Sequence, residues 1–281
     1  MVRERNELGE HLGVEIVGMT AADLVNREAA DDCRAMLERH GVVVYRGAHL
    51  DDAQLLTLSR ALGHVVVPPV TDSGDIPEVA TITMDPAKSR LAAVRKGNFL
   101  WHIDGTHDEQ PQKATLLTAW AVDPAGGDTE FATTYAAYDA LPDDDKATID
   151  DLRVVHRFSR PMRITFPGAT PEQRAAWNRV PERVHPLVWR RKDGRRSLVI
   201  GATADEIVGW SENAGRALLD RLDGWATQPR FTYRHRWREG DLVVWDNTGM
   251  LHRALPFEPT SPRVLHRTTL VGEEPVTGRV A

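Results

Sequence analysis

The pattern of apolar and polar positions near the N-terminus predicts a helix, a strand and a second helix. Apolar residues recur every three or four positions in Arg27–Arg39, which is the period of an amphipathic helix, and Gly41 is suited to end it. The apolar run Val42–Tyr45 follows directly and predicts a buried strand. Asp51 is a suitable N-cap for the next helix, whose leucines keep the helical spacing up to Leu62.

Strand patterns dominate the remainder of the chain. We expect strands at Val79–Met84, Ala114–Val122, Thr129–Thr133, Arg153–Phe158, Val184–Trp189, Ser197–Ile200, Phe231–Trp237, Leu242–Trp245 and Arg263–Val271, and helices only at about Thr134–Leu152, Pro171–Val180 and Ser211–Ala226. Gly194 and Gly240 are typical of hairpin turns, because glycine accepts a positive φ. Many short strands with few peripheral helices predict a mainly β fold with flanking helices, a jelly roll rather than a doubly wound parallel sheet.

Composition narrows the kinds of partner. The chain has 281 residues, 41% of them hydrophobic and 27% charged, with a net charge of −6. No linker or repeat divides it, so residues 1–281 are expected to form a single domain. The mild acidity argues against binding to nucleic acid or an anionic membrane and favours a small-molecule substrate. Homo-oligomer formation is left open.

Two further features bear on the expected location. Cys33 is the only cysteine, so no internal disulfide can form. The charged N-terminal residues are not followed by an apolar segment of the signal-peptide type, and no run of about 18 apolar residues is present. We therefore expect a cytoplasmic protein.

The segment Asn98–His107 contains the first candidate metal ligands. If it enters as a strand, His102 and Asp104 project from one face, while Trp101 and Ile103 project from the other face into the core. An imidazole and a carboxylate thereby become neighbours. A His-x-Asp triplet is a weak signal by itself and needs a third ligand.

His252 is the candidate for that third ligand. It follows the apolar strand Leu242–Trp245 and a polar turn. Two imidazoles and one carboxylate, bound on one face of a metal ion, leave three coordination positions open, which is typical of non-haem Fe(II) oxygenases. The same ligands could hold a catalytic zinc ion, although the sequence has no His-Glu-x-x-His helix. At this point both metals remain open.

Two arginines favour the iron interpretation. Arg263 and Arg267 share one face of the last predicted strand. Guanidinium groups that point into a barrel are costly unless anions pair with them, and each presents a fork suited to a carboxylate. The alternative is an edge strand that displays both side chains to solvent.

The sequence resembles the taurine and phenoxyacetate dioxygenase (TauD/TfdA) family of Fe(II)- and 2-oxoglutarate-dependent enzymes. The similar features are Arg27–Tyr45, Trp101-His102-x-Asp104, Gly126-Gly127-Asp128-Thr129, Trp245-Asp246-Asn247, His252 and Arg263 with Arg267. They extend over nearly the whole chain. The resemblance implies a double-stranded β-helix, another name for the jelly roll, with flanking helices.

The resemblance also implies roles for individual residues. His102, Asp104 and His252 match the family's iron ligands. Arg263 and Thr129 match the residues that bind the distal carboxylate of 2-oxoglutarate. The implied reaction consumes O2, converts 2-oxoglutarate into succinate and CO2, and hydroxylates an unactivated C–H bond of the substrate.

The substrate is less well indicated. Arg267 matches an arginine that contacts either the other end of 2-oxoglutarate or an anionic substrate. Asn98, Gly105, His107 and Phe158 are expected in the substrate pocket. A small carboxylate, sulfonate or sulfate ester is therefore expected.

One departure and two alternatives qualify this prediction. Pro68 stands where taurine-type relatives present a substrate-binding histidine, which argues against taurine itself; His64 or His107 would have to compensate. A zinc-dependent hydrolase that uses the same three ligands is one alternative function. The other is a non-catalytic barrel that binds 2-oxoglutarate.

Overall fold

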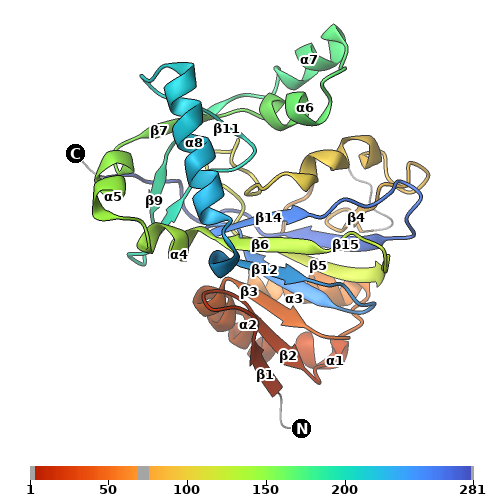
Figure 1. Cartoon of the computed structure of the whole chain (residues 1–281). Coiled ribbons are helices and arrows are strands. Elements are labelled where there is room, and N and C mark those ends of the chain that lie inside the picture. Colours follow the sequence, from red (N-terminus) through yellow and green to blue (C-terminus); the bar gives the residue numbers. More distant parts are fainter. Residues whose placement is uncertain (1–3, 69–75, 280–281) are drawn as a thin grey trace.

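The computed structural model describes residues 4–68 and 76–279. Its largest sheet contains seven strands in the order β1-β2-β3-β13-β5-β15-β4, and a second sheet has the order β12-β6-β14 (Figure 1). The strands of the larger sheet are β1 (Glu4–Glu7), β2 (Val14–Val17), β3 (Val42–Tyr45), β4 (Ala80–Ile82), β5 (Ala114–Ala121), β13 (Leu242–Asp246) and β15 (Val264–Thr269). Those of the second sheet are β6 (Thr129–Thr133), β12 (Thr232–His235) and β14 (Met250–Ala254).

Smaller sheets and helices surround these two sheets. The remaining strands are β7 (Arg153–His156), β8 (Arg183–Pro186), β9 (Val188–Arg190), β10 (Arg196–Leu198) and β11 (Ala204–Ile207). The helices are α1 (Ala21–Leu24), α2 (Arg27–His40), α3 (Asp52–Leu62), η1 (Ala92–Phe99), α4 (Thr134–Asp139), α5 (Asp143–Ile149), α6 (Ser159–Thr165), α7 (Pro171–Trp177), α8 (Glu212–Ala226) and η2 (Pro229–Phe231). No helix in the described ranges combines the length and the apolar character needed to cross a bilayer.

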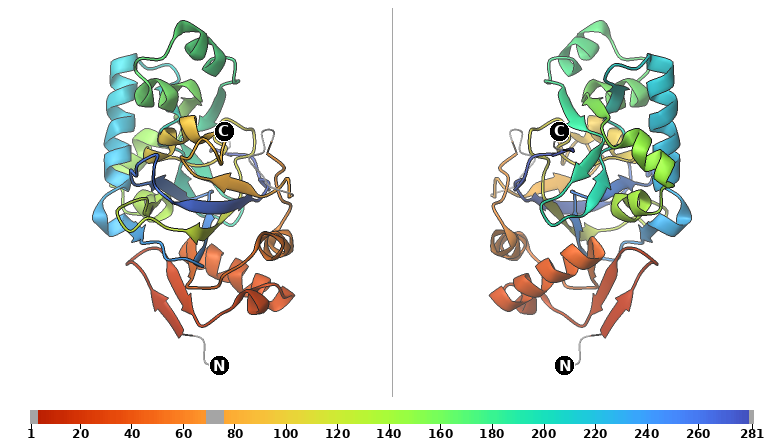
Figure 2. Two further views of the ribbon diagram at one scale, coloured as in Figure 1. Left: turned by 90° about the vertical axis from the view of Figure 1, so that its right-hand side faces the viewer. Right: turned by 90° about the vertical axis from the view of Figure 1, so that its left-hand side faces the viewer.

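Strand β13 shows how alternation builds the layers. Leu242 and Val244 belong to the apolar cluster formed with α2 and α3, whereas Val243 and Trp245 belong to the cluster between the two sheets. Successive side chains of a strand point to opposite faces, so one apolar strand supplies both clusters. The N-terminal helices therefore cover the outer face of the larger sheet (Figure 2).

The second sheet covers the inner face of the larger one. Phe131 of β6 and Met250 of β14 pack toward the larger sheet, and the residues that follow them, Ala132 and Leu251, pack in the cluster that includes α8. Residues of β14 that share the orientation of Met250 therefore face the space between the sheets. His252 is one of them, and this places it inside the barrel.

The predictions for the N-terminal elements are confirmed. Helix α2 ends at Gly41, whose φ of 69° lies in the left-handed region and whose N–H donates to the carbonyl of Leu37. Strand β3 has the predicted bounds, and the Asp51 side chain caps α3 by accepting a hydrogen bond from the backbone N–H of Gln54 at 2.8 Å. Local signals were sufficient for these elements, because helix caps act within a few residues.

Several other local predictions are wrong, among them one helix and one turn. The single helix expected at Thr134–Leu152 is two helices, α4 and α5, separated around Pro142, which lacks the N–H that a continuing helix would need. The turn at Gly240 has the expected positive φ, 81°, but is not a hairpin, because β12 and β13 belong to different sheets. The hairpin at Gly194 is confirmed by the antiparallel pairing of β9 with β10.

Candidate functional site

A single backbone bridge brings the two candidate histidines together. His102 and His252 face each other as an antiparallel pair, with N–H to carbonyl distances of 3.0 Å and 2.9 Å. Directly opposite residues in such a pair project to the same side. The centroids of the two imidazole rings lie 4.1 Å apart.

The surroundings of this bridge differ from the predicted strand. Asn98 lies in η1, only His102 bridges, and Asp104 lies in a turn. Gly105 has a φ of 77°, which bends the chain directly after Asp104. His252 lies within β14 instead of after a loop. The expected orientation of Ile103 is confirmed, since it packs in the core on the side away from the site.

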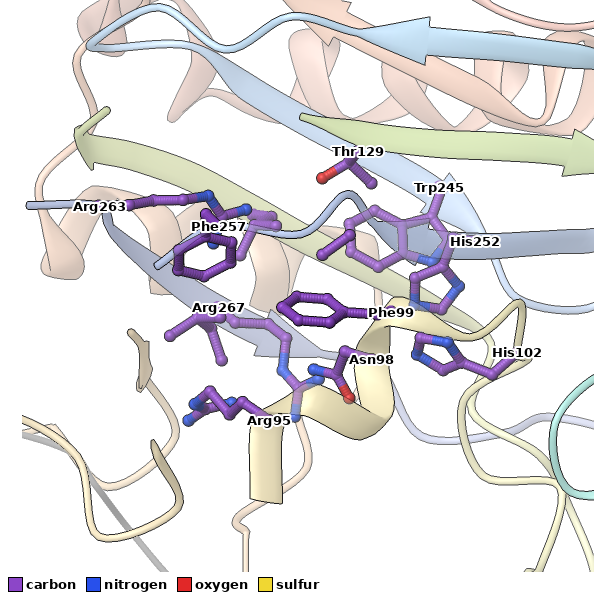
Figure 3. Close-up of a pocket in the computed structure, with 13 residues that line it drawn as sticks. Arg95, Asn98, Phe99, His102, Thr129, Trp245, His252, Phe257, Arg263 and Arg267 are labelled. Atoms are coloured by element: carbon purple, nitrogen blue, oxygen red, sulfur yellow. The ribbon is translucent and has the colours of Figure 1, made fainter. Parts of the chain in front are cut away.

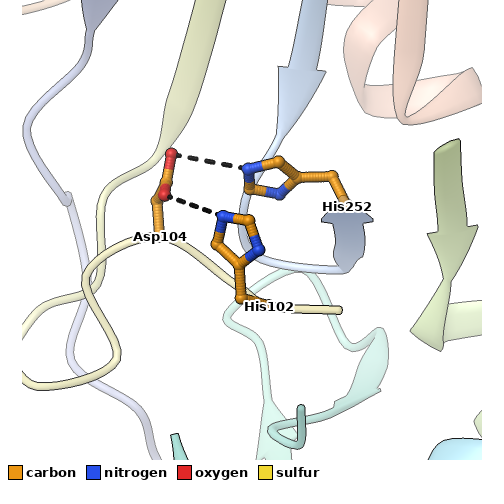
Figure 4. A group of neighbouring side chains, drawn as sticks. All are labelled: His102, Asp104 and His252. Atoms are coloured by element: carbon orange, nitrogen blue, oxygen red, sulfur yellow. Dashed lines mark ion pairs between the residues drawn. The ribbon is translucent and has the colours of Figure 1, made fainter. Parts of the chain in front are cut away.

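Asp104 completes a compact group of three side chains (Figure 4). Its Oδ1 lies 3.7 Å from Nε2 of His102, and its Oδ2 lies 3.8 Å from Nε2 of His252. One potential ligand atom from each of the three residues lies within 4.8 Å of the others, the only such cluster of three or more metal-binding groups found in the described ranges. Two ligand atoms bound about 2.0–2.2 Å from one ion lie at most about 4.4 Å apart, and the separations of 3.7 Å and 3.8 Å between Asp104 and the two histidines fall within that limit. The three residues therefore fit one metal ion.

Protonation favours metal binding at the same atoms. Nδ1 of His102 lies 2.8 Å from the carbonyl oxygen of Leu100, and donation to this carbonyl leaves the lone pair of Nε2 toward Asp104. Burial, reinforced by His102, lowers the pKa of His252 to about 3. Burial raises the pKa of Asp104, but His252, Arg267 and His102 lower it more, and the net pKa is about 2. A neutral imidazole and an ionised carboxylate are the forms that bind metal.

A pocket adjoins this group (Figure 3). Its lining is mainly apolar and aromatic, interrupted by three arginines: Ile82, Arg95, Asn98, Phe99, His102, Leu117, Thr129, Trp245, His252, Ala254, Phe257, Arg263 and Arg267. The structure thus brings Asn98, Thr129 and both predicted arginines to the same pocket as the two histidines. The Phe99 and Phe257 rings meet edge to face, with centroids 5.9 Å apart.

Arg263 is a buried cation in this pocket. It is 3% exposed, its Nε donates to the carbonyl of Gly127 at 3.0 Å, and its guanidinium lies 4.7 Å from the centroid of the Phe257 ring. Among the described residues no carboxylate lies within 4.0 Å of it. Burial lowers the pKa of Arg263 to about 10, against the opposing effect of Asp128 and Asp123. A charged guanidinium in this position calls for an anionic ligand.

Arg267 and Thr129 approach the same space from different sheets. Leu265 of β15 packs between the sheets, so Arg267, two residues further along, points the same way. Its Nη1 lies 3.8 Å from Oδ2 of Asp104. Oγ1 of Thr129 accepts a hydrogen bond from the indole N–H of Trp237 at 3.0 Å, which leaves the hydroxyl proton of Thr129 available to an acceptor.

Three predicted substrate residues lie outside the pocket lining. Gly105 is packed closely against Gln112. The rings of His107 and Phe158 contact each other edge to face, with centroids 6.3 Å apart. Neither Gly105, His107 nor Phe158 lines the pocket in this structure. Their contribution to substrate binding stays a prediction.

Arg95 was missed by the sequence interpretation. It is 8% exposed, lines the pocket from η1, and donates to the carbonyl of Thr81 at 2.7 Å. Helix η1 has the 3-10 form and its segment carries no clear helical period. No sequence signal therefore linked Arg95 to the site.

Pro68, which stands where taurine-type relatives present a substrate-binding histidine, is partly buried and does not line the pocket.

Comparisons with known proteins agree with this geometry. The family model "Taurine catabolism dioxygenase TauD, TfdA family" matches residues 4–269. The alpha-ketoglutarate-dependent 2,4-dichlorophenoxyacetate dioxygenase of Burkholderia sp. (strain RASC) is 34% identical over 254 residues, which cover 86% of this chain and 85% of that protein. The alpha-ketoglutarate-dependent sulfate ester dioxygenase of Pseudomonas putida is 31% identical, with 94% and 88% covered.

Solved structures are similar over nearly the whole chain. A taurine dioxygenase from Burkholderia xenovorans superposes with a TM-score of 0.81 at 32% identity, covering 99% of this chain and 92% of that one. The structure of AAD-2 in complex with Mn(II) and N-oxalylglycine has a TM-score of 0.81 at 29% identity, with 98% and 100% covered. These neighbours confirm the predicted jelly roll. The chain therefore belongs to the TauD/TfdA family of alpha-ketoglutarate-dependent dioxygenases.

Proposed function

We propose that this enzyme uses Fe(II), 2-oxoglutarate (alpha-ketoglutarate) and O2 to hydroxylate an unactivated C–H bond of a small anionic organic substrate. One observation carries the proposal: His102 and His252, which cluster with Asp104, line the same pocket as the buried cation Arg263. The two histidines and the carboxylate suit a redox-active ion that keeps open coordination positions. Arg263 suits the distal carboxylate of 2-oxoglutarate.

His102, Asp104 and His252 would hold the iron. When bound there, Fe(II) with 2-oxoglutarate and O2 supplies the oxidation of a C–H bond, with succinate and CO2 as coproducts. The zinc-hydrolase alternative has no support from a feature of the structure. It leaves Arg263 without a ligand, and the two relatives described above are named as dioxygenases.

The protein residues orient the reactants and exclude water. Arg263, directly before β15, and Thr129, the first residue of β6, would bind the two oxygens of the distal carboxylate. The aromatic rings of Phe99, Phe257 and Trp245 line the same pocket and would help to exclude water. A dry site strengthens each of these polar contacts and limits side reactions.

Arg267 and Asn98 would recognise the substrate. Arg267 is 30% exposed at its side chain and lies within 3.8 Å of Asp104, so an anion held by it would be adjacent to the metal. Relatives are named for 2,4-dichlorophenoxyacetate and for sulfate esters, both of which are anionic. We infer a carboxylate, sulfonate or sulfate ester as substrate.

Succinate release tests this function. The purified chain, supplied with Fe(II) and 2-oxoglutarate in air, should release succinate faster when a suitable carboxylate, sulfonate or sulfate ester is present. The release should stop without oxygen or with a chelator. Anaerobic turnover of an ester would instead support the zinc hydrolase, and 2-oxoglutarate binding without decarboxylation for any tested substrate would support the non-catalytic barrel.

Gly127 offers a test of the cosubstrate pocket. It has a φ of 80°, and an added Cβ would lie 2.5 Å from Cδ of Arg263. Gly127→Ala should therefore displace the Arg263 side chain and raise the 2-oxoglutarate concentration needed for half-maximal succinate release. It should also cost about 1–3 kcal/mol of unfolding free energy through overpacking. Gly168→Ala is the control, because no atom lies within 4 Å of its added Cβ; unchanged 2-oxoglutarate dependence in Gly127→Ala would argue against this pocket.

A further inference from the structure

A buried chain of hydrogen bonds ends on the candidate metal ligand Asp104. The indole N–H of Trp245 donates to Oδ1 of Asn247 at 2.9 Å, and Nδ2 of Asn247 donates to Oγ1 of Thr115 at 2.9 Å. The Thr115 hydroxyl donates to Oδ2 of Asp104 at 3.2 Å. Trp245 is 2% exposed, and both Asn247 and Thr115 are 0% exposed. Water therefore cannot replace these partners without a local opening of the fold.

The direction of this chain is fixed by chemistry. An indole N–H only donates, so the Asn247 carbonyl must face Trp245 and its amide must face Thr115. The hydroxyl of Thr115 has a single hydrogen. Since Thr115 already accepts from Asn247, it gives that hydrogen to the carboxylate of Asp104.

The larger sheet anchors the residues of this hydrogen-bond chain. Thr115 of β5 and Trp245 of β13 are register partners in the larger sheet. Asn247, just beyond β13, is fixed by its backbone N–H, which donates to the carbonyl of Lys113 at 2.9 Å. The sheet thus sets where the Thr115 hydroxyl lies relative to Asp104.

The two carboxylate oxygens of Asp104 consequently differ. Each oxygen faces one candidate histidine, with Oδ2 3.8 Å from Nε2 of His252, but Oδ2 alone accepts from Thr115 and lies 3.8 Å from Nη1 of Arg267. Oδ1 accepts no hydrogen bond from the described residues and lies 3.7 Å from Nε2 of His102. One oxygen is engaged by the protein and the other is available.

We propose that Thr115, oriented by Asn247 and Trp245, is a positioning residue that engages Oδ2 and leaves Oδ1 as the metal-binding oxygen of Asp104. The proposal rests on the metal site put forward above. A carboxylate that binds through one oxygen occupies one coordination position. With the two histidines, it leaves three of six positions for 2-oxoglutarate and O2. A carboxylate that bound through both oxygens would take one of those three.

Three substitutions test this role. Thr115→Val keeps the shape of the side chain and removes the hydroxyl, whereas Thr115→Ser keeps the hydroxyl. Asn247→Asp reverses the hydrogen bond between positions 247 and 115. An aspartate accepts from Trp245 and also from Thr115, which draws the Thr115 hydrogen away from Asp104. Each variant is compared with the wild-type chain.

The measurements are titrations with Mn(II) and then with 2-oxoglutarate, without turnover. Thr115→Val and Asn247→Asp should weaken Mn(II) binding by roughly 10–100-fold, as expected when a residue that supports a metal ligand is lost. They should also weaken 2-oxoglutarate binding to the Mn(II) form, since the second carboxylate oxygen of Asp104 would then compete for a coordination position that 2-oxoglutarate needs. Thr115→Ser should keep the wild-type affinities for Mn(II) and for 2-oxoglutarate, because it keeps the hydroxyl. Thermal unfolding of the metal-free proteins shows whether each variant is folded.

The outcomes separate the two proposals. Wild-type Mn(II) and 2-oxoglutarate affinities in folded Thr115→Val and Asn247→Asp would overturn the role of Thr115 while leaving the metal site intact. Equal losses in Thr115→Ser and Thr115→Val would overturn it too, because the hydroxyl would then not matter. A wild-type chain that binds no Mn(II) would overturn the metal site itself, and with it this proposal. If Thr115→Val does not fold, the comparison of Mn(II) and 2-oxoglutarate affinities between Asn247→Asp and Thr115→Ser tests the role of Thr115.

Discussion

His252→Ala is expected to abolish succinate formation that depends on Fe(II). His252 would supply one of the three proposed ligand atoms, and without it only His102 and Asp104 would hold the ion. The loss in activity should exceed the roughly 10–100-fold that follows from losing a residue that only supports a ligand. Succinate release and Mn(II) titration of the same preparation measure the effect.

A matched control separates ligand loss from unfolding. His11→Ala replaces a histidine near the N-terminus whose side chain is 37% exposed and which does not line the pocket. It should retain activity and metal affinity. Metal-dependent succinate release by His252→Ala at the level of His11→Ala would refute the assignment of the metal site.

Sequence patterns predicted those parts of the fold whose determinants are local. Helix α2, with its left-handed Gly41, and strand β3 match their predicted bounds closely. Strand pairing is not local, and this is why the pattern at Gly240 predicts a hairpin although its flanking strands enter different sheets. Strand β14 was missed because the polar residues before His252 resemble a loop. Its backbone pairs with β6, more than a hundred residues earlier in the chain.

The candidate site was predictable to the same extent. The spacing of His102 and Asp104 and the shared face of Arg263 and Arg267 are local patterns, and the structure brings all four to one region. The link between Thr115 and Asn247 is not local. It arises only because β5 and β13 are neighbours in the sheet, and no motif in either segment indicates it.

Net charge was a poor guide to the pocket. The chain as a whole carries −6, but three arginines line the pocket beside the metal group. Interactions between exposed charges more than a Debye length apart are largely screened by salt, whereas interactions between buried groups are screened much less. An acidic surface and an anion-binding pocket are therefore compatible.

Arg263→Leu is expected to raise the 2-oxoglutarate requirement far more than the substrate requirement. Arg263 is 3% exposed and has no carboxylate partner among the described residues, so its proposed partner is the distal carboxylate of 2-oxoglutarate. Removing one member of such a buried charged pair costs on the order of 2–5 kcal/mol. That corresponds to a rise of roughly 30-fold to several thousand-fold in the dissociation constant.

The comparison with a second arginine makes this prediction specific to the pocket. Arg234→Leu changes an arginine that is 49% exposed and pairs with Glu130 on the outside of the second sheet. Since Arg234 does not line the pocket, its 2-oxoglutarate affinity should stay close to that of the wild type. Titration of 2-oxoglutarate into the Mn(II) forms of both variants measures the difference directly. If Arg263→Leu weakened substrate and 2-oxoglutarate equally, Arg263 would not be the specific partner of the cosubstrate, and its buried charge would require another ligand.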